Sequence, residues 1–258
     1  MKFQQIRNAT VIIEYANTRF LIDPMLSAKE SFPGFPGTVN NELSNPLVEL
    51  PLPISELLKV DAVILTHTHL DHWDETAKNT IPKEMPIFVQ NEQDRAEVEQ
   101  DGFTNIQILG QETEFKGIRM TKTSGQHGSD KIMTEFGQLL GSVCGIVFMH
   151  PTEKTVYLAG DTIWNRFVDD SIKKHSPDII ILNSGDAQII GLGSIIMGKQ
   201  DVLKVHEAAP DATIIATHME AVNHATLSRN ELREFTVENE FEEMVLIPQD
   251  GETLTLNS

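Results

Sequence analysis

Residues 62–72 read AVILTHTHLDH, a short apolar run that ends in a dense group of histidine and aspartate. An apolar, β-branched run of this length is typical of a strand buried on both faces. On an extended backbone, residues two apart project to the same side, so His67 and His69 can bind one ion together. Asp71 would follow on that side, and His72 would face a second ion once the chain turns. The stretch therefore predicts a metal site at a strand end.

The alternative for any single histidine is a polar loop residue that binds no metal. Three histidines and an aspartate within six residues make that alternative unfavourable, because packed imidazoles without an ion would bury polar nitrogens that lack partners. Imidazole and carboxylate suit zinc, iron, nickel or manganese. Cys144 is the single cysteine, so we expect neither an intrachain disulfide nor a cysteine-based zinc site.

Three further segments share this design, an apolar run that stops at a small residue and then an acid or a histidine. The predicted strands 156–159, 179–182 and 213–216 lead to Asp161, Asp186 and His218, respectively. Rigid scaffolds commonly present reactive side chains at such strand ends. For Asp186, a role in forming a turn is the favoured interpretation.

Other segments complete a layered arrangement. The runs 10–15 and 19–22 predict two strands of a hairpin. Helices are predicted over 201–208 and over 228–237, where Ser228 and Glu231 have the spacing of a capping box. Strands mixed with helices indicate an α/β or α+β domain whose helices lie outside the sheets.

The bulk composition narrows the class of protein. Of the 258 residues, 40% are hydrophobic and 22% are charged, which is enough apolar material for one globular domain over residues 1–258. The net charge of −18, without a basic block, disfavours nucleic acid as a partner. Because no apolar run suits a signal peptide or a bilayer span, we expect a cytoplasmic protein without a membrane partner. Assembly into a homo-oligomer is left open.

Residues 24–53 differ from the rest of the chain, since they are rich in proline and glycine and contain no predicted strand or helix. A loop of this length in a compact domain is often a lid or a binding loop. We weigh a lid and an inert surface excursion equally, and Phe32 and Phe35 make the lid worth testing.

The pattern His67-x-His69-x-Asp71-His72 resembles the signature of the metallo-β-lactamase superfamily. The further histidines and aspartate of that signature fall in the expected order at His127, Asp161 and His218. The resemblance implies a four-layer αββα sandwich with ions in a cleft at one edge, where the two sheets meet. It also implies two ion sites, the first with His67, His69 and His127, the second with Asp71, His72 and His218, and Asp161 as the bridge.

The family resemblance further implies one or two divalent ions, zinc foremost, with manganese or iron as alternatives. A metal-bound hydroxide would attack an ester, lactone or phosphodiester bond of a small molecule, and the candidate substrates include small anions. Asp71 would orient that hydroxide. Within the superfamily, the chain is most similar to the branch that contains ascorbate phosphate lactonases.

Two other functions remain alternatives, a mono-iron oxygenase of the same fold that acts on a sulfur compound and a non-catalytic metal-binding relative. His224 lies six residues beyond His218. We predict that it protonates a leaving group or binds substrate, and the alternative is a solvent-facing loop histidine.

Overall fold

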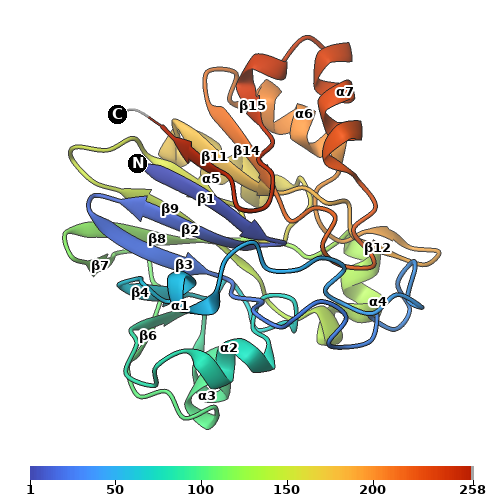
Figure 1. Ribbon diagram of the computed structural model, residues 1–258. Helices are drawn as coiled ribbons and strands as arrows, with labels where there is room; N and C mark the ends of the chain where they lie inside the picture. Colours follow the sequence, from blue (N-terminus) through green and yellow to red (C-terminus); the bar gives the residue numbers. More distant parts are fainter. Residues whose placement is uncertain (257–258) are drawn as a thin grey trace.

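Two large sheets face each other in the computed structural model, which describes residues 1–256 (Figure 1). The first sheet has the order β16 (Thr253–Thr255), β1 (Lys2–Arg7), β2 (Thr10–Tyr15), β3 (Thr18–Ile22), β4 (Ala62–Ile64), β5 (Ile87–Val89) and β6 (Ile106–Ile108). The second has the order β15 (Val245–Leu246), β14 (Thr213–Thr217), β11 (Ile179–Asn183), β10 (Val156–Leu158), β9 (Cys144–Met149), β8 (Ile118–Ser124) and β7 (Thr113–Phe115). A separate hairpin pairs β12 (Gln188–Ile189) with β13 (Gly193–Ser194).

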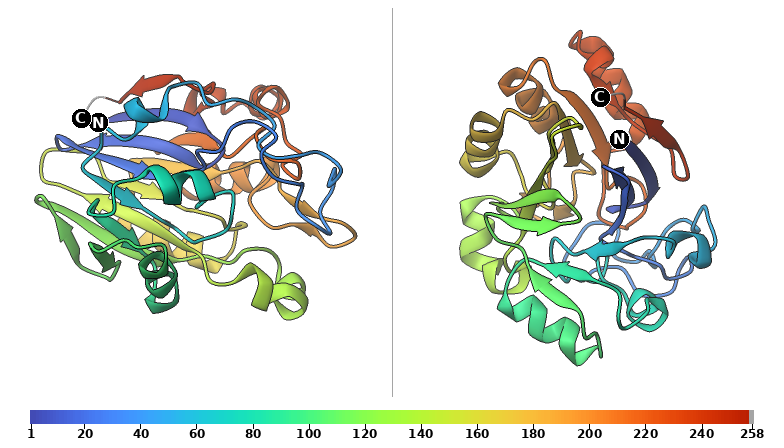
Figure 2. Two further views of the ribbon diagram at one scale, coloured as in Figure 1. Left: turned by 60° about the horizontal axis from the view of Figure 1, so that its bottom comes forward. Right: turned by 90° about the vertical axis from the view of Figure 1, so that its left-hand side faces the viewer.

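Three apolar clusters hold these layers together. Side chains from both sheets, such as Phe20 and Phe148, form the central core between them. The outer face of the first sheet packs against α1 (Ile54–Leu57), α2 (Glu75–Thr80) and α3 (Glu92–Gln100), and that of the second against α5 (Arg166–His175), α6 (Lys199–Ala208) and α7 (Arg229–Glu238). The end-on view of Figure 2 shows the helices outside the paired sheets. The predicted four-layer αββα arrangement is confirmed.

The strands that lead to the candidate site residues are central and buried. Every residue of β4, β10 and β11 is buried, and β14 pairs in parallel with β11. The hairpin of β2 and β3 turns at Ala16 and Asn17, both with a positive φ, which is the geometry of a two-residue turn that matches strand twist. Because sheet pairing fixes these strands on both sides, their carboxyl ends are rigid positions for functional groups.

The two predicted helices agree with α6 and α7 to within two residues at each end. Helix α7 carries the predicted capping box, in which Ser228 and Glu231 each bond to the backbone amide of the other. Helix α6 begins at Lys199 because extended backbone at Gly198 precedes it, and it ends before Pro210. In the described part of the chain, no helix is both long and apolar enough to cross a membrane.

The 24–53 segment connects β3 to α1 and is irregular, as predicted. Buried Arg7 donates hydrogen bonds to the carbonyls of Met25, Ser27 and Val48, so one guanidinium holds both ends of the segment. The middle of the segment lies beside the β12–β13 hairpin in both Figure 1 and Figure 2. Helix α4 (Asp130–Leu140) packs against the same hairpin through Ile132 and Leu140. These three elements stand outside the sheet layers, at one end of the sandwich.

Candidate metal centre

The loops that follow four strands meet at one edge of the sandwich. His67, His69, Asp71 and His72 follow β4 of the first sheet. The second sheet contributes the other three candidate ligands, His127 after β8, Asp161 after β10 and His218 after β14. All except His69 are buried, and His69 is partly exposed. The structure therefore brings together all seven candidate ligands from the sequence.

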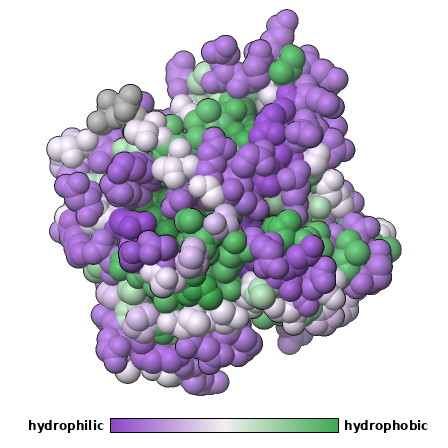
Figure 3. All heavy atoms as spheres, in the orientation of Figure 1, coloured by the Kyte–Doolittle hydropathy of each residue, from purple (hydrophilic) through white to green (hydrophobic). Residues whose placement is uncertain are grey.

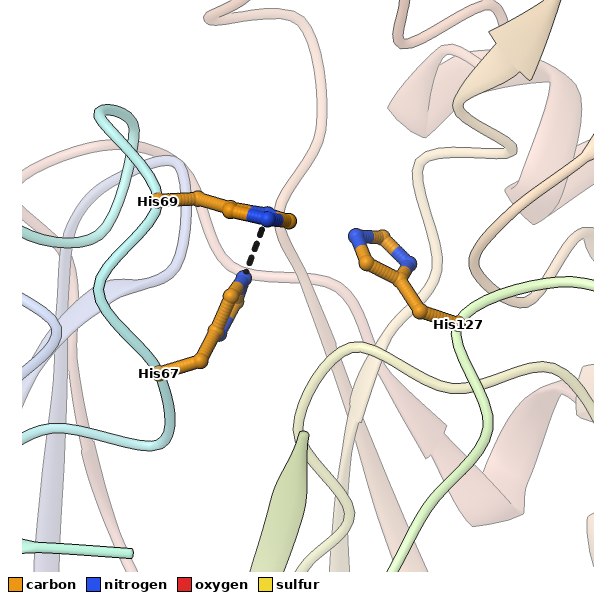
Figure 4. Close-up of side chains that lie close together, drawn as sticks. All are labelled: His67, His69 and His127. Atoms are coloured by element: carbon orange, nitrogen blue, oxygen red, sulfur yellow. Dashed lines mark hydrogen bonds between the residues drawn. The ribbon is translucent and has the colours of Figure 1, made fainter. Parts of the chain in front are cut away.

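Three groups within this cluster are compact enough to hold an ion. The ligand atoms lie within 4.8 Å of one another in each group, and the groups are His67 with His69 and His127, His67 with His72 and Asp161, and Asp71 with His72 and His218. Figure 4 shows the imidazoles of the first group facing one another across two loops. Asp161, a member of the second group, lies between the first and third groups. Its Oδ2 is 3.2 Å from Nε2 of His72 in the third group and 3.6 Å from Nε2 of His127 in the first.

Buried partners orient the candidate ligands from behind. Asp23 Oδ2 lies 2.9 Å from His72 Nδ1 and also accepts a hydrogen bond from the Thr66 hydroxyl. His127 Nδ1 lies 2.8 Å from the carbonyl oxygen of Ile195. Contacts of this kind fix the ring orientation and the tautomer of a histidine ligand. Each ring is thereby left with its other nitrogen directed at the cluster.

The two candidate carboxylates are held in the same way. Asn183 Nδ2 donates to Asp161 Oδ1 at 2.6 Å. Asn8 Nδ2 donates both to the carbonyl and to the Oδ2 of Asp71. Because these bonds occupy one side of each carboxylate, the remaining lone pairs face the histidines.

Close backbone approach also shapes the edge. Gly185 lies so near the carbonyl of His218 that a Cβ atom there would clash with it. Gly160 has a φ of +71, which L side chains rarely adopt, and it immediately precedes Asp161. The small residues after the strands are therefore needed to bring the strand-end loops together.

Electrostatics within the cluster match a cation site. Burial, assisted by neighbouring imidazoles, holds the pKa of His67 well below its usual value, and burial lowers the pKa of His127 to about 4. Burial disfavours ionised Asp71 and Asp161, but the facing histidines outweigh it and keep the pKa of both carboxyls well below the usual range. Neutral imidazole and ionised carboxylate are the forms that bind metal.

The contacts among the histidines test whether a metal fits. His67 Nε2 lies 3.0 Å from His69 Nδ1, and His72 Nε2 lies 3.3 Å from His218 Nε2. Burial opposes a charge on His72, yet the carboxylates around it, Asp161 foremost, raise its pKa well above the usual value. The carboxylates thus require a buried positive charge. One or two divalent ions satisfy both the facing nitrogens and this requirement, so the donor set fits them.

A cavity of about 550 Å³ opens onto the cluster. His69, Asp71, His127, Asp161 and His224 line its polar end. The rest of its lining is apolar except for Gly37 and Thr38. The apolar residues come from the middle of the 24–53 segment (Phe35 and Pro36), from α4 (Phe136, Leu139 and Leu140), from the β12–β13 hairpin and the residue after it (Ile189, Ile190, Leu192 and Ile195), and from the loop after β4 (Leu70). Residues 35–38 of the 24–53 segment therefore form part of the cavity wall.

His224 lies in the wall and is no solvent-facing histidine. It is only 6% exposed, and its ring packs edge-on against Phe35 at 4.9 Å. Its Nδ1 has no hydrogen-bond partner among the described residues. Burial lowers the pKa of His224 to about 4, so the ring is neutral near pH 7 and can donate one hydrogen bond.

Asp186, a weaker candidate from the sequence, has a structural role, and so does Trp73, which directly follows the histidine motif. Asp186 has a positive φ and accepts hydrogen bonds from Gln188 and Ser194, which places it in the turn before the hairpin. Trp73 follows the histidine motif but is buried in the core of the first sheet, with its indole N–H bonded to Asp101. Neither side chain lines the cavity.

Sequence reasoning missed the groups behind the ligands. Asp23 carried the same signal as the recognised sites, since it directly follows the apolar end of β3. Asn183 also had this signal, since it directly follows the apolar run 179–182, whereas Asn8 had none, because it contacts a carboxylate that is remote in sequence. The apolar lining was also missed, since the sequence alone does not place α4 and the hairpin beside the cluster.

Comparison with known proteins agrees with this geometry. Residues 18–219 match the model of the beta-lactamase superfamily domain. The chain is 53% identical over 256 residues to UPF0173 protein YddR of Bacillus subtilis (strain 168), covering 99% of this chain and 100% of that protein. A UPF0173 metal-dependent hydrolase of Herpetosiphon aurantiacus is 26% identical over 177 residues, 67% of this chain and 66% of that one.

A solved structure is similar over its entire length. The isothiocyanate hydrolase from Delia radicum gut bacteria is 49% identical to this chain, with a TM-score of 0.98 and coverage of 100% of both chains. The family match over most of the chain, the fold and the His/Asp cluster lead to one conclusion. The chain belongs to the beta-lactamase superfamily and is a metal-dependent hydrolase of the metallo-β-lactamase fold.

Proposed function

We propose that this chain hydrolyses an isothiocyanate, R–N=C=S, whose substituent R is uncharged and apolar. The cavity carries the proposal, because its polar end lies at the candidate metal centre and most of the rest of its lining is apolar. The whole-length similarity to an isothiocyanate hydrolase supports the same choice of bond.

The lining also bears on the substrates that the sequence suggested. Within the described part of the chain, no lysine or arginine lines the cavity. The charged group of a phosphodiester or a phosphorylated lactone, placed in the apolar part, would be buried without a partner. A neutral substituent instead gains from removal of its apolar surface from water. The cavity thus favours a neutral substrate over a small anion.

The reaction adds one water to the central carbon. The water oxygen bonds to that carbon while the π electron pair of the C=N bond moves to nitrogen, which takes one proton of the water. This addition gives R–NH–C(=S)OH. Its C–N single bond then breaks, nitrogen takes the second proton of the added water, and R–NH₂ and carbonyl sulfide leave. A divalent ion, held by the seven residues of the cluster, would lower the pKa of water and polarise the substrate.

Two residues of the chain have distinct roles in this scheme. Asp71 presents an ionised carboxylate at the polar end of the cavity, where it orients the attacking water through a hydrogen bond. His224, neutral and in the wall, donates a hydrogen bond to the substrate nitrogen or sulfur as negative charge develops there. This role suits its lowered pKa better than storage of a proton does.

A substrate panel tests the proposal. Purified protein loaded with zinc, manganese or iron is assayed for amine formation from allyl, butyl and benzyl isothiocyanate. In parallel, hydrolysis of lactones, phosphodiesters and thioesters is measured with the same preparations. We expect saturable, metal-dependent release of amine and carbonyl sulfide, with the largest kcat/KM for an isothiocyanate. A lactone, phosphodiester or thioester with a larger kcat/KM than every isothiocyanate would overturn it.

A further inference from the structure

We propose that Asn223 is a positioning residue that holds the apolar wall against the metal-binding cluster and thereby sets the preference for the substituent R. The substituent part of this inference rests on the proposed function. Asn223 lies between His218 and His224 in sequence and does not line the cavity. It therefore acts through the residues that it holds.

Every hydrogen-bonding group of the buried Asn223 side chain is used, and each contact is to the 24–53 segment. Its Nδ2 donates to Thr38 Oγ1 at 2.9 Å and to the Val39 carbonyl at 2.8 Å. Its Oδ1 accepts from the Phe35 amide at 3.1 Å and from Asn45 Nδ2 at 2.8 Å. One amide thus fixes the stretch that contributes Phe35 and Thr38 to the cavity.

Backbone contacts extend this hold to the hairpin and to His224. The 24–53 segment bonds to β12, because Val39 donates to the Gln188 carbonyl and Ile190 donates to the Gly37 carbonyl. The Gln188 amide in turn donates to the carbonyl of His224. Residues 35–45, 188–195 and 221–225 therefore form one interlocked unit, which we term the clasp.

The clasp contacts two of the residues at the polar end of the cavity. Phe35 packs against the ring of His224, and the carbonyl of Ile195 lies against His127 Nδ1. Loss of the Asn223 amide would leave four groups without their bond, two on buried Thr38 and Asn45 and two on partly buried Phe35 and Val39, which favours displacement of the 35–45 stretch. Because the strand ends hold the ligands independently, we expect the wall to move and the metal-binding cluster to stay.

The experiment compares kcat and KM of metal-loaded Asn223→Ala with those of metal-loaded wild-type protein, for methyl, butyl and benzyl isothiocyanate. We expect KM for the benzyl compound to rise about tenfold, the scale on which an apolar pocket discriminates, with kcat for the methyl compound within about threefold of wild type. Metal content should be unchanged. A uniform loss of kcat for all three substrates, or no change in their relative KM values, would overturn the assignment.

Two further variants keep the test decisive. Asn45→Ala removes one of the four contacts of the Asn223 side chain at a residue that does not line the cavity, so it should shift KM in the same direction by a smaller factor even if Asn223→Ala folds poorly. Asn105→Ala is the matched control, since this exposed amide bonds the carbonyl of Glu84, remote from the clasp and the cavity, and it should leave the KM values unchanged.

Hydrogen exchange separates this inference from the proposed function. In Asn223→Ala, amide exchange should accelerate over 35–45 and 188–195 while 62–66 stays protected, whichever substrate the enzyme accepts. If wild-type protein hydrolyses no isothiocyanate but Asn223→Ala shows this exchange pattern, the proposed function fails and the positioning role stands. Unchanged exchange over 35–45, or equal acceleration over 62–66, would contradict the positioning role.

Discussion

The metal-binding cluster and the apolar wall of the cavity sit side by side but are built differently. The cluster lies on loops that directly follow central strands, and His72 and His218 are fully buried. The wall comes from an irregular segment, a helix and a hairpin outside the sheets, and Leu139 and Ile190 are 75% and 60% exposed. Figure 3 shows apolar surface on this projecting part of the molecule. The comparison teaches that the sheets hold the candidate ligands in place, whereas peripheral segments form the apolar lining of the cavity.

The largest effect should come from His69→Ala, which removes a candidate ligand from the cluster. A bound metal typically stabilises the transition state by several kcal/mol, so loss of this stabilisation corresponds to a drop in kcat/KM of at least about a thousandfold. The melting temperature should change little, because the sheets hold the strand ends independently. Kinetics at saturating metal, with thermal unfolding, check this. His150→Ala, a histidine remote from the cavity, is the control, and near-wild-type turnover of the His69 variant would contradict a role for that ring.

His224→Ala tests the boundary between the two regions, since this residue lies in the wall but faces the cluster. We expect turnover to fall roughly a hundredfold, the scale of losing one hydrogen-bond donor to a developing negative charge, with full metal content. A substrate with a poor leaving group should suffer most. Equal loss across leaving groups would favour a pure binding role, and loss of metal along with activity would identify His224 as a ligand.

Asp23→Asn perturbs the cluster from behind without removing a ligand. The partner of a metal-bound histidine typically contributes between about 10- and 100-fold to metal affinity or activity. We therefore expect weaker metal binding by this factor, measured by competition with a chelator, and recovery of activity at high metal concentration. Affinity equal to that of wild type would mean that contact with Asp23 does not tune His72.

Ile190→Ala should have the smallest effect, confined to the wall. Removing part of an exposed apolar side chain should raise KM for benzyl isothiocyanate about threefold and leave the methyl compound unchanged. Val237→Ala on α7, which is similarly exposed but remote from the cavity, is the matched control. A rise in KM of the same size for both substrates would argue against an apolar subsite at Ile190.

The two regions also differed in how far sequence predicted them. The cluster could be predicted from the sequence because a ligand motif directly follows an apolar run, as in residues 62–72, and because strand ends converge in a sandwich. The 10–15 strand and the Ser228 capping box were accessible because their signals are local. The wall was not, since Asn223 contacts Asn45, 178 residues away in sequence, and neither residue type carries a sign of its partner. Arg7 shows the same limit, as its three acceptors are backbone carbonyls.

The central claim is that the seven-residue cluster holds the metal on which hydrolysis depends, and a metal titration tests it most directly. Protein stripped with chelator is titrated with zinc, and in parallel with manganese and iron, while bound metal and turnover of benzyl isothiocyanate are followed together. We predict that stripped protein is inactive and that turnover rises with bound metal to a plateau between one and two equivalents. Stripped protein that keeps full turnover, or that takes up no metal, would contradict the account.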